Sequence, residues 1–318
     1  MRFGDFLGNE SLKERLGASF DAGKASHCYL ISGPAGSGRH TLARLMTAAL
    51  ECEGGGEMPC GTCRACRKVM AGTHPDVVLV DDPEKKQVPV ECIRQARADA
   101  FIRPNEGRHK IFLIPRAQDM NASAQNALLK ILEEPPSYGV FLLLAENPCA
   151  LLPTVRSRCA ELRLSPLSQD ALLAALLARF PGRTEEERRA AAVRSGGFLG
   201  QAVAWLDHSE ELLPQTETFA KTYAARDALG LLTLLCSMER WKRAQAADAL
   251  GQWQRLIADA LQAREGLPAS GPLCRAIAER RTPAELLYAA GTLRQAVSDC
   301  WANVGVANIC AGLAVLLR

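Results

Sequence analysis

The chain has 318 residues, 48% of them apolar, and carries a formal net charge of +3. This length allows two or three domains, and the small net charge argues against both a strongly basic nucleic-acid-binding surface and an acidic partner. No run of about 18 apolar residues predicts a membrane span, and the N-terminus lacks the basic-then-apolar layout of a signal peptide, so we expect a soluble cytoplasmic protein. In that reducing compartment the twelve cysteines indicate metal ligation or buried thiols rather than disulfides.

The first half of the chain alternates short apolar runs with amphipathic helical patterns. Such alternation favours a parallel sheet covered by helices on both faces. The first run leads directly into a glycine-rich loop, and the segment after it, Thr41–Leu50, has a helical pattern. This strand–loop–helix order is the context that a phosphate-binding loop requires. The runs of strand length are Tyr29–Ser32, Asp76–Val80, Lys110–Ile114, Val140–Ala145 and the weaker Glu161–Leu164.

The glycine-rich loop has the skeleton of a P-loop at Gly33, Gly36 and Gly38, but the residues that carry its chemistry are replaced. A P-loop continues with lysine, which reaches the terminal phosphates, and with serine or threonine, whose hydroxyl ligates magnesium. Arg39 and His40 stand at these two positions. Arginine presents a wide planar fork instead of a compact ammonium, and histidine has no hydroxyl. Backbone N–H groups at the helix start can still hold an anion, but we expect no tight binding of ATP.

Four cysteines follow the helix predicted after the glycine-rich loop: Cys52, Cys60, Cys63 and Cys66. The glycines between them allow tight turns. Four thiolates at this spacing can surround zinc, and such a closed site is structural because no coordination position is open for chemistry. The alternative is four unrelated thiols in one loop. The other cysteines lie on apolar stretches without a histidine partner and are expected to be small core residues: Cys28, Cys92, Cys149, Cys159, Cys236, Cys274, Cys300 and Cys310.

The second half of the chain is predicted to be mainly helical. Asn121 can cap a helix that runs to Glu133. From about Ser209 the chain is rich in alanine and leucine, a composition typical of packed helices. Shorter helices are predicted between these parts, at Gln169–Arg179, Thr184–Ser195 and Leu199–Leu206.

Beside the glycine loop and the four cysteines, the first 165 residues contain the segments Phe3–Asn9, His27–Leu30, Gly72–Asp76, Asn126–Lys130 with Leu132–Pro136, and Ser157–Cys159. In this order they resemble subunits of the bacterial DNA polymerase III clamp loader, the AAA+ assembly that opens the ring-shaped sliding clamp, and most closely its delta-prime family. The resemblance implies an α/β AAA+ P-loop module at 1–165 with an inserted zinc module at 52–66. A small helical lid domain at 166–208 and an all-α collar domain at 209–318, which joins subunits in a ring, would follow.

The members of this family that hydrolyse ATP, the gamma and tau subunits, have four catalytic features that can be checked here. The first is the P-loop pair already described. The second is an Asp-Glu pair that ends the third strand, where this chain has Pro115 and Arg116. The third is a polar residue at the end of the next strand, replaced by Ala145, and the fourth is a lid arginine, replaced by Gly200. The resemblance therefore implies a degenerate ATPase that does not hydrolyse ATP by itself.

One catalytic element of the family is present. Ser157-Arg158-Cys159 resembles the motif whose arginine reaches in trans into the nucleotide site of a neighbouring subunit. Such an arginine finger neutralises charge in the transition state of phosphoryl transfer. The resemblance thus implies a stator subunit that activates its neighbour through Arg158, with Arg156 as a second phosphate contact. The alternative for Arg158 is a surface arginine or a structural salt bridge.

The partners that the resemblance implies are the gamma/tau and delta subunits, the sliding clamp and primer–template DNA. Arg94, Arg97 and Arg103 could touch DNA phosphates without reading the sequence, or they could form a solvated helix face. Two other functions are alternatives: an active clamp-loader ATPase of the gamma/tau type, and a zinc-module nucleic-acid-binding protein. The near-neutral charge disfavours the latter.

Overall fold

The structure, a computed structural model, describes residues 3, 6–54, 56–208, 213–266, 271–301 and 304–317. The chain divides into two compact units, one made of Met1–Phe180 with Arg194–Val203 and the other of Pro181–Val193 with Ala204–Arg318. The predicted division into AAA+, lid and collar domains, with boundaries at 165/166 and 208/209, stays a prediction.

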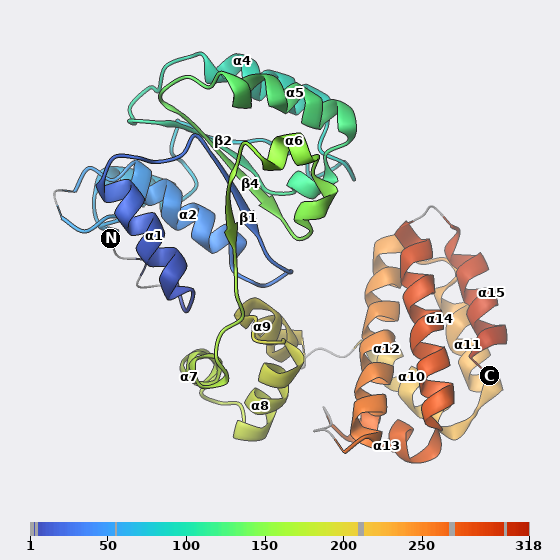
Figure 1. The fold of residues 1–318 in the computed structure, drawn as a ribbon. Coiled ribbons are helices and arrows are strands. Elements are labelled where there is room, and N and C mark those ends of the chain that lie inside the picture. The colour runs from blue at the N-terminus through green and yellow to red at the C-terminus, as the bar shows by residue number, and fades with distance from the viewer. Residues whose placement is uncertain are drawn as a thin grey trace. The chain divides into compact units, whose positions relative to one another are not determined.

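The first unit is built on a five-stranded parallel sheet with the strand order β2-β3-β4-β1-β5 (Figure 1). The central strand β4 has every residue buried, because helices cover both faces of the sheet, and its sequence is accordingly apolar without alternation. The predicted parallel α/β sheet is confirmed. Its strands are β1 (Cys28–Ser32), β2 (Val77–Leu79), β3 (Lys110–Ile114), β4 (Gly139–Ala145) and β5 (Ala160–Arg163).

Successive residues of β4 point to opposite faces of the sheet and enter two different apolar clusters. Phe141 and Leu143 pack in a cluster with helices α4 (Val90–Ala100), α5 (Ala122–Glu133) and the short α6 (Pro153–Arg156). Leu142 and Leu144 pack in a second cluster with α1 (Glu10–Asp21) and α2 (Arg39–Leu50). The two faces can be followed in Figure 1.

Two predicted helices of this unit have the predicted limits, and the helix predicted at Thr41–Leu50 begins two residues earlier, at Arg39. The side chain of Asn121 accepts a hydrogen bond of 2.9 Å from the N–H of Ala124, as an N-cap does, and α5 ends at Glu133. Helix α7 spans Gln169–Arg179. The remaining short elements are α3 (Arg64–Met70) and the 3₁₀ helices η1 (Ala117–Asp119) and η2 (Pro148–Ala150).

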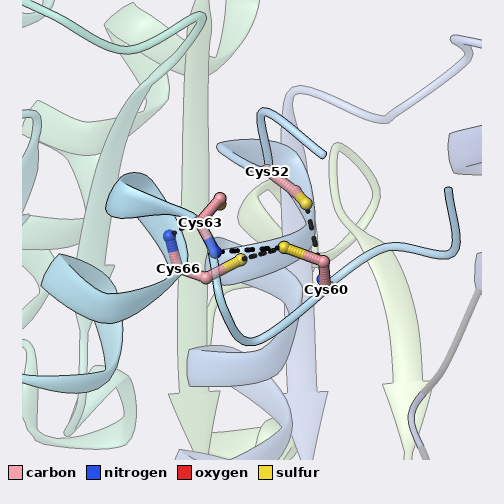
Figure 2. Close-up of side chains that lie close together, drawn as sticks. All are labelled: Cys52, Cys60, Cys63 and Cys66. Carbon is pink, nitrogen blue, oxygen red and sulfur yellow. Dashed lines mark hydrogen bonds between the residues drawn. The ribbon is translucent and has the colours of Figure 1, made fainter. Parts of the chain in front are cut away.

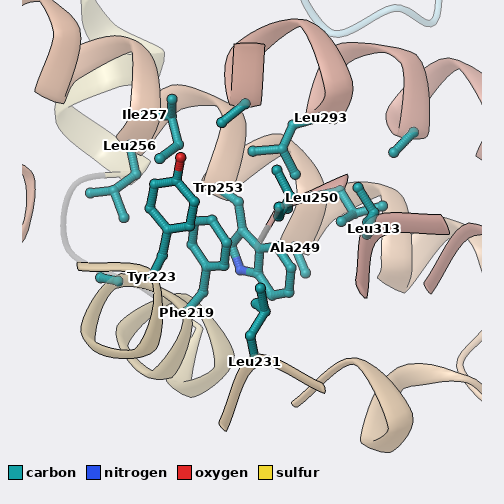
Figure 3. Close-up of a cluster of buried hydrophobic side chains, with 14 of the residues drawn as sticks. Phe219, Tyr223, Leu231, Ala249, Leu250, Trp253, Leu256, Ile257, Leu293 and Leu313 are labelled. Carbon is teal, nitrogen blue, oxygen red and sulfur yellow. The ribbon is translucent and has the colours of Figure 1, made fainter. Parts of the chain in front are cut away.

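The second unit is helical, and its core is a row of stacked aromatic rings (Figure 3). The rings of Phe219 and Trp253 stack with centroids 4.3 Å apart, and Phe219 stacks on Tyr223 at 5.4 Å. The guanidinium of the buried Arg281 lies 4.1 Å from the centre of the Tyr223 ring. Its helices are α8 (Glu185–Arg194), α10 (Pro214–Ala225), α11 (Ala228–Met238), α12 (Arg243–Arg264), α13 (Pro272–Arg280), α14 (Pro283–Trp301), α15 (Val306–Leu316) and the end of α9 (Leu199–His208).

The prediction that the dispersed cysteines are core residues is partly wrong. Cys149 and Cys236 are exposed, Cys92 and Cys159 are half-buried, and the other four are buried. Cys236 lies on the outer face of α11, whose inner face carries its buried leucines and methionine. Among the described residues, none of the helices combines the length and apolar character that crossing a membrane demands.

Candidate functional site

The glycine-rich loop joins β1 to α2, as predicted, and has the backbone of a phosphate cradle. Gly36 and Gly38 have positive φ angles of 73° and 93°, a conformation that glycine adopts without a steric penalty. The N–H of Gly33 donates to the carbonyl of Ala145 at the end of β4, at 3.2 Å. Helix α2 starts directly after Gly38, so its first N–H groups face the loop.

Arg39 does not extend freely from this cradle. Its side chain is 9% exposed, and Nη2 lies 2.8 Å from Oε1 of Glu146, the residue that follows β4. The guanidinium of Arg39 is thus paired with the carboxylate of Glu146 instead of being free to meet a phosphate. Burial lowers the pKa of His40, and the positive charges of Arg39 and Arg44 lower it further, which favours the neutral imidazole.

The apex of the loop is covered by the backbone at the start of α9. The N–H of Gly200 donates to the carbonyl of Gly36 at 2.9 Å, and Nε2 of Gln201 donates to the carbonyl of Ala35 at 2.8 Å. A Cβ atom added to Gly200 would lie 2.7 Å from Cα of Gly36, so any larger residue would force the two segments apart. The position where the family carries its lid arginine therefore holds a glycine in backbone contact with the loop.

Arg116 follows β3, at the second of the two positions, Pro115 and Arg116, where the resemblance places an Asp-Glu pair. Its guanidinium makes a two-pronged pair with Asp81, with Nη2–Oδ1 and Nε–Oδ2 distances of 2.6 and 3.0 Å. It also donates to the carbonyls of Asp82 and Lys85. The hydrogen bonds to Asp81 raise the pKa of Arg116. This position thus carries a fixed positive charge, which repels a divalent cation.

A cavity of about 380 Å³ lies beside the loop. Its volume falls within the range of about 300–1,000 Å³ that is usual for small-molecule pockets. Its lining includes the apolar side chains Phe6, Leu7, Leu167, Phe198 and Val203 and the polar side chains Ser37, His40 and Arg179.

Arg158 lies just after α6, and its side chain is 34% exposed. Nη2 lies 2.8 Å from Oε1 of Glu133 at the end of α5, and Nη1 donates to the carbonyl of Thr154 at 2.9 Å. Glu133 is itself about half exposed, so water competes for this pair and the arginine can leave it at low cost. Arg156 is paired with Glu161 at 3.6 Å.

The four predicted metal ligands come together in one cluster (Figure 2). The sulfurs of Cys52, Cys60, Cys63 and Cys66 all lie within 4.8 Å of one another. A tetrahedral zinc site with Zn–S bonds of about 2.3 Å separates its sulfurs by about 3.8 Å, so small side-chain movements suffice to close the site around the ion.

Backbone N–H groups point at the cysteine sulfurs, as thiolate ligands require. The N–H of Cys63 donates to Sγ of Cys60, and the N–H of Cys66 donates to Sγ of Cys63, both at 3.3 Å. The first of these bonds, aided by the N–H of Thr62, lowers the pKa of Cys60 to about 6. Burial raises the pKa of Cys66. The donor set and its surroundings fit zinc, which would hold the loop together without an open coordination position.

Both ends of this cysteine module are anchored to a single loop, residues 105–109. The buried carboxylate of Asp76 accepts hydrogen bonds of 2.5–2.9 Å from the N–H groups of Asn105, Glu106 and Gly107. The buried carboxylate of Glu51, next to Cys52, accepts bonds of 2.9 Å from the next two N–H groups along the loop. Lys68 of α3 pairs with Glu106. The module is thus held at its start, its helix and its end.

Residues 8–168, just over half of the chain, match the protein family described as DNA polymerase III, delta subunit. The chain belongs to this family. The predicted membership of the clamp-loader subunits, and with it the α/β AAA+ class, is confirmed.

Several relatives share this clamp-loader sequence. A DNA polymerase III subunit delta' from Pseudomonas aeruginosa is 38% identical over 54% of this chain and 53% of the relative. A subunit gamma/tau from Mycobacterium tuberculosis is 31% identical over 72% of this chain and 40% of the relative. The chain thus spans about two fifths to one half of these relatives. A gamma subunit-related protein of Thermotoga maritima has the same fold, with a TM-score of 0.52 and 17% identity over 97% of this chain and 99% of that chain.

In this clamp-loader subunit the sequence indicated Arg39, Arg116 and Arg158 as notable residues, but it did not indicate the carboxylates that pair with them. Nothing local in the sequence marks Glu146, Asp81 or Glu133 as the partner of a distant arginine. Glu51 carried a signal that could have been used: it ends an apolar helical run directly before the first cysteine. A charged residue in a buried run indicates a specific partner.

Replacing Cys60 and Cys63 together with serine is expected to release one zinc per chain, because two ligands cannot hold a structural ion. Amide hydrogen exchange should then accelerate between Cys52 and Gly72, while β3 and β4 stay protected. Metal analysis and exchange mass spectrometry check this, with Cys149→Ser/Cys236→Ser as the matched control. A protein that holds no stoichiometric metal, purified without chelators, would refute the zinc assignment.

Replacing Asp76 with asparagine is expected to lower the free energy of unfolding by about 2–3 kcal/mol at pH 7, since an amide cannot accept all three backbone bonds of a charged group. Burial alone would raise the pKa of Asp76, but these three hydrogen bonds outweigh it and lower the pKa. The stabilisation is therefore present above the unfolded pKa of about 4 and is lost as the pH falls through the lower folded pKa.

Urea unfolding at pH 7 and at pH 3 measures this difference. Asp82→Asn is the control, because the carboxylate of Asp82 accepts one backbone bond, from the N–H of Glu84 at 3.2 Å in an exposed turn, and pairs with the exposed Lys85 at 3.4 Å. A loss for Asp76→Asn that is as small as the control's, or that does not shrink at low pH, would show that the carboxylate is not the anchor.

Proposed function

We propose that this chain is a non-hydrolysing stator subunit of the replicative clamp loader. It helps to load the sliding clamp on primed DNA in the cytoplasm, and it supplies Arg158 in trans to the ATPase site of a neighbouring subunit. The observation that carries the proposal is the pair of ion pairs, Arg39–Glu146 and Arg116–Asp81. Arg39 stands where an active site needs a phosphate-binding lysine, and Arg116 stands in place of the glutamate that orients water in the family's Asp-Glu pair.

The environment of Arg158 supports the second half of the proposal. The guanidinium lies at the surface, and its one carboxylate partner, Glu133, is exposed. A planar fork of this kind suits bidentate contact with a phosphate. On this proposal a γ-phosphate on the neighbouring subunit takes the place of Glu133, and the arginine neutralises the charge that develops during transfer.

The proposed partners are the gamma/tau and delta subunits, the sliding clamp and, within the assembly, primer–template DNA. The proposed collar domain carries large exposed apolar side chains on α14 and α15, among them Leu287 and Tyr288 with exposed fractions of 66% and 56%. Such side chains suit contact with another protein. Arg94, on α4, is exposed and pairs only loosely with Glu91, at 3.7 Å, so a phosphate contact there stays a proposal.

The isolated chain is expected to release no phosphate from Mg-ATP above background. A variant with a restored loop, Arg39→Lys/His40→Thr, should stay inactive too, because Pro115 and Arg116 still stand where the family has its Asp-Glu pair. A phosphate-release assay on both proteins decides this. ATP turnover by the native chain that disappears in Arg39→Ala would instead support an active ATPase of the gamma/tau type. Salt-dependent binding of DNA by the chain alone would support a nucleic-acid-binding protein.

A further inference from the structure

Two cysteines outside the zinc module lie side by side across the sheet. Strands β1 and β5 are parallel neighbours, with Tyr29 opposite Ala160, so the preceding residues, Cys28 and Cys159, also lie opposite each other. Their sulfurs are 3.1 Å apart. Neighbouring strands are about 4.8 Å apart, which falls within the Cα separation of about 4.4–6.8 Å that a disulfide spans.

The two sulfurs lie on the same face of the sheet. Cys28 belongs to the apolar cluster formed with α4 and α5, and Cys159 packs against that cluster. A disulfide between them needs the sulfurs to approach to about 2.05 Å, a shift of about 1 Å. Rotation of the two side chains supplies this shift without moving either strand.

The two thiols differ in their access to solvent. Cys28 is fully buried, whereas Cys159 is only half-buried and follows the short helix α6. A small oxidant therefore meets Cys159 first. The hydrogen bond with Cys159, together with burial, raises the pKa of Cys28, so Cys28 stays a thiol until its neighbour has reacted.

We propose that Cys28 and Cys159 form a reversible disulfide site that a hydroperoxide oxidises. In the first step the sulfur of Cys159 attacks the peroxide, whose O–O bond breaks, and a sulfenic acid and one water or alcohol form. In the second step the sulfur of Cys28 attacks the sulfenic sulfur, the S–O bond breaks, and the proton of Cys28 leaves with the hydroxyl as water. Two thiols lose two electrons and the peroxide gains them, and a dithiol reverses the change. In reducing compartments, disulfides of this transient kind are the ones that occur.

The site is next to Arg158 in the chain, which suggests a consequence that rests on the proposed function. A disulfide would tie the residue after the finger to β1, while Arg158 remains held by Thr154 and Glu133. The turn that carries the arginine would then be less free to follow the nucleotide site of a neighbouring subunit. We expect oxidation of this chain alone to slow ATP turnover of the assembly at least two-fold, and a dithiol to restore it.

Peptide mapping tests the site without reference to ATP. The folded chain is treated with a small excess of hydrogen peroxide, unfolded, alkylated and digested without reductant. We expect a peptide pair joined through Cys28 and Cys159, which dithiothreitol separates. In Cys28→Ser the reaction should stop at the sulfenic acid of Cys159, so that dimedone labels this residue several-fold more than in the native chain.

Two results would overturn the proposal. In one, Cys159 of the native chain is labelled by dimedone while Cys28 is recovered as a free thiol. In the other, both residues stay reduced while the exposed Cys149 and Cys236 are oxidised. A mapped cross-link that leaves ATP turnover unchanged would keep the disulfide site and remove only its link to Arg158.

Discussion

Replacing Arg158 with alanine is expected to lower ATP hydrolysis at the neighbouring site of the reconstituted clamp loader by about 10³-fold or more, the effect of losing an arginine finger. The physical reason is that the guanidinium of Arg158 would neutralise the charge that develops on the transferring phosphate. Pre-steady-state phosphate release with clamp and primed DNA measures the loss, because the share of the burst that belongs to this one site should disappear.

The matched control for this variant is Arg189→Ala. Arg189 is also an exposed arginine paired with a glutamate, Glu185, at 2.6 Å, but it lies on α8, away from the finger motif in sequence. Gel filtration must show that both variants assemble. If the assembly hydrolyses ATP equally well with either variant, Arg158 is a surface arginine and the chain is a scaffold without a part in catalysis.

Replacing Trp253 with alanine is expected to be the most damaging single substitution in the helical unit, at about 3–5 kcal/mol of its unfolding free energy. Trp253 is fully buried and stacks face to face on Phe219, and an alanine would leave a cavity at the centre of the core. The midpoint of thermal unfolding of this unit should fall by ~10–20 °C, followed by far-ultraviolet circular dichroism.

Trp253→Phe separates the two contributions to this loss. The indole Nε1 of Trp253 is buried and has no hydrogen-bond partner among the described residues, and leaving such a donor unpaired costs free energy. Phenylalanine removes that donor along with part of the ring, so its loss should be clearly smaller than that of alanine. Leu229→Ala, at a side chain that is 74% exposed, is the control and should change stability by less than about 0.5 kcal/mol. If Trp253→Ala and Leu229→Ala lost equal amounts of unfolding free energy, the stacked rings would not determine the stability of this unit.

Arg39 and Arg116 are held by carboxylates that lie far from them in the sequence. An arginine buried alone near the strand ends would be costly, yet Arg39 and Arg116 each meet a carboxylate within 3 Å. Breaking one partner of such a pair leaves an uncompensated charge. Glu146 and Asp81 therefore neutralise the charges of these two arginines within the chain itself.

The elements of the first unit were predictable from the sequence to within a few residues. The apolar run at Val140–Ala145 has no polar alternation because β4 is buried on both faces, and Asn121 marks its helix start by a local cap. The cysteine cluster was predictable as well, since its ligands are close in the chain. The expectation for Cys149 and Cys236 failed because which face of a short element turns outward depends on what packs against the other face.

The sequence by itself determined the parallel α/β class, the glycine loop followed by Arg39 and His40, the four neighbouring cysteines and the segment Ser157–Cys159, because each is a pattern of neighbouring residues or of short spacings. Only the tertiary structure decided which carboxylates hold Arg39, Arg116 and Arg158, which loop anchors the cysteine module, and that Cys28 meets Cys159. These partners lie 107, 35 and 25 residues apart for the three arginines and 131 apart for the two cysteines. Contacts over such separations follow from the order of strands in the sheet, and no local spacing encodes that order.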